Sequence, residues 1–323
     1  MPKETWFGLH AATYGNTFEE VKQDCLEAER RGLHLFTVID HFMNEFHPWQ
    51  GPHPLECWTT LAGLAAVTEK IRLGPLVSCY GYRHPTVLAK MATTVDNISN
   101  GRMILGLGGG WHGDEFKGYM GRFPPSGERL TGLKETVEIC RSMLTNEITD
   151  YDGKLYKVEK ALNSPPPVQK HLPIMIGGSG EKVTLKIAAE HADITHFVAR
   201  TSPGKDDKTV LKSKLSALKM HCDAAGRDYD EIRKGTWLIL TIDETMNGAE
   251  LKLKKTAKWL RVPPEAIKNM QSMRAGICGT PDMVVDRVRE YIDLGFELIT
   301  FILLPQPSKS DIQLLAQDVI KAL

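Results

Sequence analysis

The sequence predicts an α/β protein and, within that class, a (β/α)8 TIM barrel. Short apolar runs alternate along the chain with longer segments of helical period, which is the pattern of parallel strands joined by helices. Eight such runs can be counted, the number that closes a barrel, and a final helix follows the last one. A length of 323 residues would also accommodate two domains of ordinary size. We interpret residues 1–323 as a single barrel domain.

The strands are predicted from these apolar runs. In chain order they fall at residues 6–10, 33–39, 72–78, 103–108, 173–176, 194–198, 236–242 and 297–304. The helices are recognised by apolar residues at helical spacing; in the first of them, at 17–31, Phe18, Val21 and Cys25 recur on one face and Gly32 stands at the expected C-terminal cap. Further helices are predicted at 55–67, 85–98, 183–191 and 311–322.

Two connections are too long for simple barrel units and are interpreted as insertions after strands four and seven. The first, at 111–171, contains a predicted helix at 127–144 and a hairpin at 148–158 that turns at Asp152-Gly153. The second, at 243–279, is predicted to be helical around 249–260 and 264–273. Both would lie at the C-terminal mouth of the barrel, where they could cover a ligand.

Composition excludes several classes of function. The 40 Lys and Arg balance the 40 Asp and Glu, which argues against a protein that binds nucleic acid or acidic membranes through a basic surplus. No run approaches the roughly 18 apolar residues of a membrane span, and the N-terminus has no apolar signal core. The six cysteines are scattered without a CxxC pair, so we expect free, mostly buried thiols and a cytoplasmic protein.

Asp40 and His41 follow the second predicted strand and so fall at the edge of the barrel that carries catalysis. A histidine there can give or take a proton near neutral pH, and the neighbouring aspartate can fix its tautomer or bind a polar ligand group. The alternative is a loop histidine that bonds only to backbone. His47, His53 and Glu45 lie in the same loop, but their spacing is not that of metal ligands, and we predict no metal site.

Two glycine-rich runs follow predicted strands. The first, at 106–111, resembles a dinucleotide fingerprint but has Trp111 where the third glycine should stand. It indicates instead a close approach of backbone to a flat ring or a neighbouring strand, or simply a bend at the rim. The second, at 177–180, links a strand to a helix and favours a phosphate site, the alternative being a tight cap without ligand. Trp58, Trp237 and Trp259 lie in apolar segments and are interpreted as core.

The chain resembles the luciferase-like monooxygenases, and in particular their deazaflavin (F420)-dependent oxidoreductase branch. The resemblance covers nearly the whole chain, and the order and spacing of its motifs are specific. The motifs are FTVIDHF (36–42), ECWTTLA (56–62), RLGPLV (72–77), YRHP (82–85), LAKMATTVD (88–96), GRMILGLG (101–108), GW (110–111), GER (127–129) and IGGSG (176–180).

The resemblance implies a TIM barrel that holds F420 or a flavin in its mouth and forms a homodimer. It implies that His41 is the catalytic residue and that a set of residues binds the cofactor: Asp40, Pro75, Leu76, Ser78, Gly109, Gly110, Asp114, Gly177, Gly178, Ser179 and Gly180. Members of the family have a cis peptide bond before a residue other than proline in the third strand. The matching bond joins Pro75 to Leu76, which would place Leu76 behind the cofactor ring.

The chain departs from the sugar-phosphate dehydrogenase of this family. Trp111 stands where that enzyme has a catalytic glutamate, and its phosphate-gripping basic residues have no clear counterparts, so glucose 6-phosphate is not the expected substrate. Trp111 is assigned to a pocket for a larger carbonyl, imine or alkene. We expect hydride transfer between F420 and a small organic substrate, with His41 as proton donor or acceptor. The alternatives are an FMN-dependent monooxygenase that needs a flavin reductase and a cofactor-binding protein without turnover.

Overall fold

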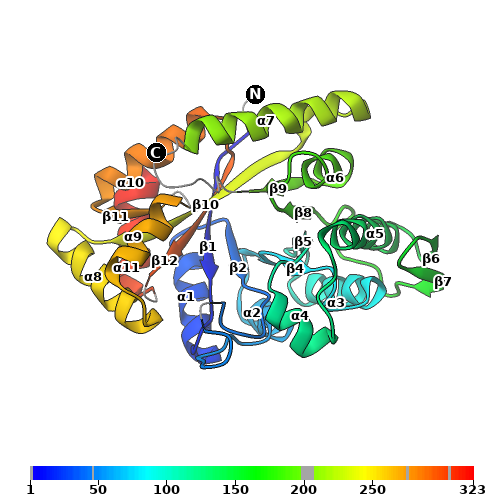
Figure 1. Cartoon of the computed structure of the whole chain (residues 1–323), viewed down its shortest axis with the longest axis horizontal. Helices are drawn as coiled ribbons and strands as arrows, with labels where there is room; N and C mark the ends of the chain where they lie inside the picture. The colour runs from blue at the N-terminus through cyan, green and yellow to red at the C-terminus, as the bar shows by residue number, and fades with distance from the viewer. Residues whose placement is uncertain (1–2, 46, 198–206, 274–275, 305–306) are drawn as a thin grey trace.

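The parallel strands of the chain form a nearly closed barrel surrounded by helices (Figure 1). The computed structural model describes residues 3–45, 47–197, 207–273, 276–304 and 307–323. The sheet path runs β3-β2-β1-β12-β10-β9-β8-β5-β4. The bounds of these strands are β1 Trp6–Ala11, β2 Leu35–Val38, β3 Arg72–Pro75, β4 Ser78–Cys79, β5 Leu105–Gly108, β8 Ile174–Gly177, β9 Ile194–His196, β10 Arg233–Ile242 and β12 Leu298–Leu303.

The two ends of this path belong to the same predicted strand. The segment predicted as one strand at 72–78 is divided by Leu76 and Val77 into β3, which pairs with β2, and β4, which pairs with β5. A parallel bridge between Leu73 and Met103 brings the two ends together. The predicted barrel is therefore confirmed, with β3 and β4 counted as one strand. Val198, the predicted end of the sixth strand, lies outside the described residues.

Helices cover the outside of the barrel. They are α1 Phe18–Arg30, α2 Cys57–Val67, α3 Pro85–Ile98, α4 Gly113–Met120, α5 Ser126–Thr145, α6 Thr184–His191, α7 Asp207–Ala225, α8 Met246–Leu260, α9 Pro264–Met273, α10 Pro281–Asp293 and α11 Lys309–Leu314. Local sequence starts several of them: Thr17 and Glu20 cap α1 reciprocally, and Pro85 occupies the first turn of α3. The predicted last helix begins at α11 and continues as a wider π-helical turn, Leu315–Val319.

Both long connections have the predicted helices. Between β5 and β8 lie α4, α5 and a hairpin of β6 (Ile148–Asp152) and β7 (Lys157–Leu162). The second strand of the hairpin ends four residues later than predicted. The carboxylate of Glu135 on α5 accepts hydrogen bonds from the backbone N–H groups of the turn at Lys154, Leu155 and Tyr156.

The second long connection, between β10 and β12, contains α8, α9, the unpredicted strand β11 (Ile277–Gly279) and α10. β11 is too short to show a period in the sequence and exists by pairing with β10.

The apolar side chains of the barrel form two layers, one between strands and helices and one inside the barrel. Because side chains alternate along a strand, Phe36 packs outward against the helices while Leu35 belongs to a separate interior cluster. That cluster also contains Leu76, Ile104 and Met175. All six cysteines are free thiols, five of them buried, as predicted.

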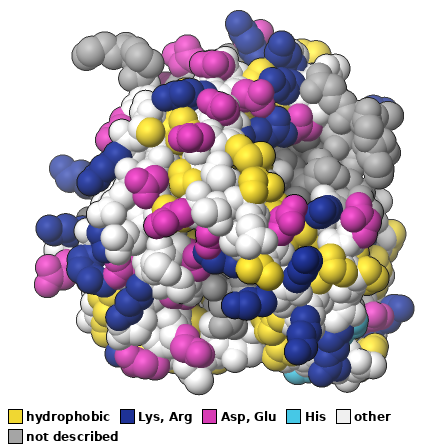
Figure 2. Space-filling view, turned by 90° about the vertical axis from the view of Figure 1, so that its left-hand side faces the viewer, with side chains coloured by type: hydrophobic (Ala, Val, Ile, Leu, Met, Phe, Trp, Pro, Cys, Tyr) yellow, Lys and Arg dark blue, Asp and Glu magenta, His cyan; other side chains and the backbone are white. Residues whose placement is uncertain are grey.

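The surface carries both signs of charge. Lysine and arginine side chains are interspersed with aspartate and glutamate over the face drawn in Figure 2, consistent with the balanced composition of the chain. None of the described helices is both long enough and apolar enough to span a bilayer.

Candidate active site

A cavity of about 370 Å³ opens where the parallel strands end. Ala12 follows β1 in its wall, His41 follows β2, Gly109 follows β5 and Gly178 follows β8. The carboxyl ends of barrel strands meet at one edge, and enzymes of this fold carry their chemistry there. The cavity is therefore the candidate active site.

Most of the predicted site residues line this cavity: Asp40, His41, Leu76, Gly109, Gly110, Trp111, Gly177, Gly178 and Ser179. Four others, Pro75, Ser78, Asp114 and Gly180, are not part of the wall that the described residues form. Ser78 is fully buried behind the wall and accepts a hydrogen bond of 2.9 Å from Nε1 of Trp58. Asp114 is half-buried in the first turn of α4. Cofactor binding by any of these residues stays a prediction.

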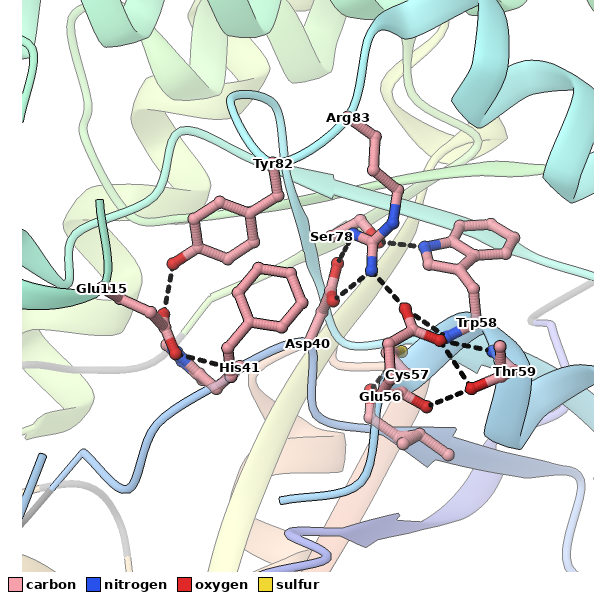
Figure 3. Close-up of polar contacts among 12 residues, drawn as sticks. Asp40, His41, Glu56, Cys57, Trp58, Thr59, Ser78, Tyr82, Arg83 and Glu115 are labelled. Carbon is pink, nitrogen blue, oxygen red and sulfur yellow. Dashed lines mark hydrogen bonds and ion pairs between the residues drawn. The ribbon is translucent and has the colours of Figure 1, made fainter. Parts of the chain in front are cut away.

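The ring of His41 is held by a carboxylate from α4. Its Nδ1 lies 2.7 Å from Oε2 of Glu115 (Figure 3). The Glu115 side chain is fully buried, and its Oε1 accepts the backbone N–H groups of Phe42 and Met43 at 2.5 and 2.8 Å. The hydroxyl of Tyr82 donates to Oε2. Among the described residues, none forms a hydrogen bond with Nε2 of His41.

This environment favours the charged forms of both partners. Burial by itself would lower the pKa of His41, but the hydrogen bond and the negative charge of Glu115 outweigh it and raise that pKa. Burial would also raise the pKa of Glu115, but His41, Tyr82 and the backbone of Met43 together lower it. His41 is therefore disposed to carry a proton near neutral pH.

Asp40 forms an ion pair with Arg83. Arg83 donates two hydrogen bonds to its carboxylate, at 2.8 and 3.1 Å, and a third of 2.5 Å to Glu56 (Figure 3). Glu56 in turn accepts the backbone N–H groups of Trp58 and Thr59 in the first turn of α2. Burial raises the pKa of Asp40, and the positive charge of Arg83 opposes that rise. Arg83 thus ties the segment after β2 to the start of α2.

The cis peptide bond lies one residue later than predicted. It joins Leu76 to Val77, and the bond between Pro75 and Leu76 is not cis, so the position predicted from the resemblance is wrong. The sheet explains the difference, because the N–H of Leu76 still donates to the carbonyl of Val38 at 3.0 Å and extends the pairing of β3 with β2. The chain changes partner only after Leu76, where Ser78 pairs with β5.

Glycines on the neighbouring strands make room for the side chain of Val77. A Cβ at Gly108 or Gly177 would lie 2.6 or 2.8 Å from a Val77 methyl group. Gly110 has a φ of +68°, and a Cβ there would overlap Sγ of Cys79. In the run at 106–111, Gly108 and Gly110 therefore allow close packing against the neighbouring segment around Val77 and Cys79, which was one of the predicted alternatives.

The glycine-rich loop after β8 does not run directly into a helix, because α6 begins only at Thr184. The N–H of Gly178 donates to the carbonyl of His196 at 3.0 Å, so this donor is already used within the protein. Nζ of Lys214 on α7 donates to the carbonyl of Ser179 at 2.8 Å. The same Nζ lies 3.7 Å from Oε1 of Glu181, so this positive charge beside the loop is already paired within the protein. That the loop binds a phosphate stays a prediction.

Two buried histidines and a tryptophan meet inside the barrel, deeper than His41. Nδ1 of His10 is 2.9 Å from Oγ1 of Thr37, and Nε2 of His196 is 2.7 Å from Oγ1 of Thr300. Burial lowers the pKa of each histidine to about 3, so both rings are neutral at physiological pH. The ring of Trp237 lies 6.0 Å from each, and its Nε1 has no partner among the described residues.

The prediction that three tryptophans belong to the core is right for one of them. Trp58 is buried in the main core. Trp237 packs against the interior cluster but also lines the cavity, as does Trp259 at the end of α8. An apolar segment in sequence does not tell whether a large ring faces a packed neighbour or an open cavity.

The other histidines after β2 are used within the protein. Nε2 of His47 is 2.7 Å from the carbonyl of Leu260, and Nδ1 of His53 accepts the N–H of Asn44 at 3.3 Å. No three metal-ligating side chains come close enough together to hold an ion in the parts of the chain that the structure describes.

Sequence reasoning missed three residues of this site: Tyr82, Arg83 and Glu115. Tyr82 and Arg83 stand in one of the motifs quoted above, but nothing in the local pattern assigns them partners. Glu115 follows His112 by three residues, a spacing typical of helix capping, and His112 does accept the N–H of Glu115. The contact between Glu115 and His41 crosses from one connection to another and has no local signal.

The chain matches the family described as luciferase-like monooxygenases over residues 4–298. It belongs to this family and is an enzyme of it. This agrees with the resemblance drawn from its sequence motifs.

Two curated relatives and one solved structure show how far the similarity extends. An uncharacterised protein of Mycobacterium tuberculosis is 33% identical in an alignment of 180 residues that covers 51% of this chain and 63% of that protein. An F420-dependent glucose-6-phosphate dehydrogenase of Nakamurella multipartita is 28% identical over 93% of this chain and 91% of its own. The structure of an F420-dependent secondary alcohol dehydrogenase with an F420-acetone adduct superimposes with a TM-score of 0.84 at 18% identity, over 99% of each chain.

Proposed function

We propose that this enzyme transfers a hydride between coenzyme F420 and a small organic substrate, with His41 giving or taking the substrate proton. The observation that carries the proposal is a histidine at the cavity whose Nδ1 is held by a buried carboxylate and whose Nε2 has no described partner. The names of two similar proteins support the cofactor, since both are F420-dependent dehydrogenases.

The residues of the cavity suit a cofactor that has a flat ring and, apart from it, a phosphate group. Gly109 and Gly110 leave one stretch of wall without side chains, and a Cβ at Gly110 would close it against Cys79. Leu76 and Val77 supply an apolar stretch of the wall. When bound, the deazaflavin supplies hydride transfer. The residues proposed to contact it are Asp40, Leu76, Gly109, Gly110 and, at the phosphate, Gly177, Gly178 and Ser179. Pro75, Ser78, Asp114 and Gly180, which were also predicted, lie outside the described wall and are proposed to support these contacts from behind.

The side chains at the mouth divide the remaining work. His41 holds a proton on the ring nitrogen that Glu115 does not engage and gives it to a substrate oxygen, or takes one from it in the reverse direction. The Trp111 ring lies 5.6 Å from the His41 ring and is proposed to shield the substrate from water. His10 and His196 present neutral rings deeper in the cavity. A neutral carbonyl compound or alcohol suits these surroundings better than a sugar phosphate does.

A second candidate is an FMN-dependent monooxygenase supported by a flavin reductase. The family description favours it, and the same cavity could hold FMN. In this case His41 would face a substrate that reacts with oxygen rather than with a hydride.

Parallel titrations of the purified full-length chain with F420 and with FMN separate the two. We expect F420 to bind at least tenfold more tightly, and reduction of F420 by an alcohol from a graded panel under anaerobic conditions. Tighter binding of FMN, with oxygen consumption when a reductase is added, would establish the alternative. Binding of neither cofactor would overturn both candidates.

Two further proposals concern the oligomeric state and the cellular location of the enzyme. We propose that it assembles as a homodimer, as the resemblance implies, and that it acts in the cytoplasm. Light scattering of the purified chain tests the first, with a mass near twice 36.1 kDa as the expected result.

A further inference from the structure

We propose that Glu115 is a positioning residue that fixes both the ring orientation and the tautomer of His41, with Tyr82 as its support. This inference rests on the proposed function, because it matters for turnover only if His41 handles the substrate proton. Glu115 itself need not touch substrate or cofactor.

The two oxygens of Glu115 hold two different parts of the same segment. Oε1 accepts the N–H groups of Phe42 and Met43, the two residues that follow His41, at 2.5 and 2.8 Å. Oε2 meets Nδ1 of the ring at 2.7 Å and also accepts from the Tyr82 hydroxyl. One carboxylate therefore fixes the backbone after the histidine as well as its ring, which leaves the ring little freedom to rotate.

The donor count fixes the tautomer. An ionised carboxylate can only accept hydrogen bonds, so the nitrogen that faces it must carry hydrogen. Besides the His41 ring, three donors surround the fully buried Glu115 side chain, namely the N–H groups of Phe42 and Met43 and the Tyr82 hydroxyl, which compensates for the loss of water and keeps it ionised. Nδ1 of His41 therefore stays protonated, and only Nε2 can gain or lose a proton.

Other charged or titratable groups around His41 do not compete for Nδ1. Asp40 is paired with Arg83, and Glu45 on the same loop acts on His41 only through its charge. The His112 ring lies 5.9 Å away, and Nδ1 of His112 is used by the N–H of Glu115. His10 on β1 is neutral, and burial raises the pKa of Tyr82 far above physiological pH.

The first test uses the unaltered protein. In ¹⁵N spectra of the histidine-labelled full-length chain, we expect the neutral ring of His41 to carry its hydrogen on Nδ1 at high pH. A neutral ring protonated on Nε2 would overturn the proposal. The protonation of the His41 ring is measured without F420. The positioning role of Glu115 can therefore be refuted while the proposed function stands, and the proposed function can be refuted while the positioning role stands.

The second test compares Glu115→Gln with Tyr82→Phe. Glu115→Gln removes the charge, and we expect the pKa of His41 to fall by at least one unit and kcat to fall at least tenfold, while the Kd for F420 changes less than threefold. Tyr82→Phe leaves the ion pair of His41 with Glu115 in place, so the pKa of His41 should change less than in Glu115→Gln. The control is Glu128→Gln, which removes a half-buried carboxylate that pairs with the exposed Arg122 and should change none of these values. An unchanged pKa of His41 in Glu115→Gln would reduce Glu115 to a structural residue and overturn the proposal.

Discussion

Nδ1 of His41 lies 2.7 Å from Oε2 of Glu115, although 74 residues separate the two along the chain. A second ion pair lies beside the first. It joins Asp40, which precedes His41, to Arg83, which follows Tyr82. Arg83 holds Asp40 while Tyr82 donates to Glu115. Arg83 thus contacts Asp40 directly, whereas Tyr82 reaches His41 only through Glu115, and the adjacent residues Asp40 and His41 each belong to a buried ion pair.

Replacement of His41 by glutamine should lower turnover by about two orders of magnitude, the usual contribution of a general acid or base. F420 binding should change little, because the ring does not form part of the proposed phosphate or ring contacts. Steady-state turnover and a fluorescence titration measure the two effects separately. Full turnover in this variant would exclude His41 from the reaction.

Replacement of Arg83 by methionine should destabilise the fold by about 3–5 kcal/mol, because it leaves Asp40 buried without its cation. Urea denaturation measures the loss. The control is Arg122→Gln, which removes an exposed ion pair with Glu128 and should leave the midpoint unchanged. Equal midpoints for both variants would show that Asp40 does not need its partner.

Two glycines on one segment should respond to alanine in opposite directions. Gly110→Ala places a Cβ against Cys79 at a φ of +68° and should cost roughly 1–3 kcal/mol and weaken cofactor binding. In Gly118→Ala, in α4, the new Cβ would meet no neighbouring group within 4 Å apart from the adjoining backbone of its own helix, and the change should stabilise by roughly 0.5–1 kcal/mol. Urea midpoints of the two variants check the signs, and a stable Gly110→Ala protein would contradict the close-approach interpretation.

The buried histidines should make the fold sensitive to acid. The pKa of His196 is about 3 in the folded protein against an ordinary value of 6.5, so the unfolded chain binds the proton first as pH falls. Stability is therefore lost progressively below pH 6.5 and down to about 3, at roughly 1.4 kcal/mol per pH unit for each such histidine. Urea midpoints between pH 7.5 and 4.5 should fall less steeply in His196→Gln. Equal slopes would mean that His196 is not buried neutral.

Local pattern was enough for the barrel and for part of the site. The hydrophobic period within each strand and each helix is short, so these elements can be detected without knowing which strands pair with one another. The position of His41 just past β2 followed from the same pattern, because barrel strands present their carboxyl ends at one edge. The glycine runs near Gly110 and Gly178 were also visible, since they interrupt an apolar strand pattern.

The sequence by itself therefore determined the fold class and the face of the barrel on which His41 lies. Only the tertiary structure decided that Glu115 holds His41, that Arg83 holds Asp40 and that the chain changes sheet partner after Leu76 rather than before it. The physical reason is that hydrophobic period and turn chemistry act between near neighbours in the chain. The partner of a buried charge is chosen by whichever side chain the closed barrel brings within hydrogen-bond distance.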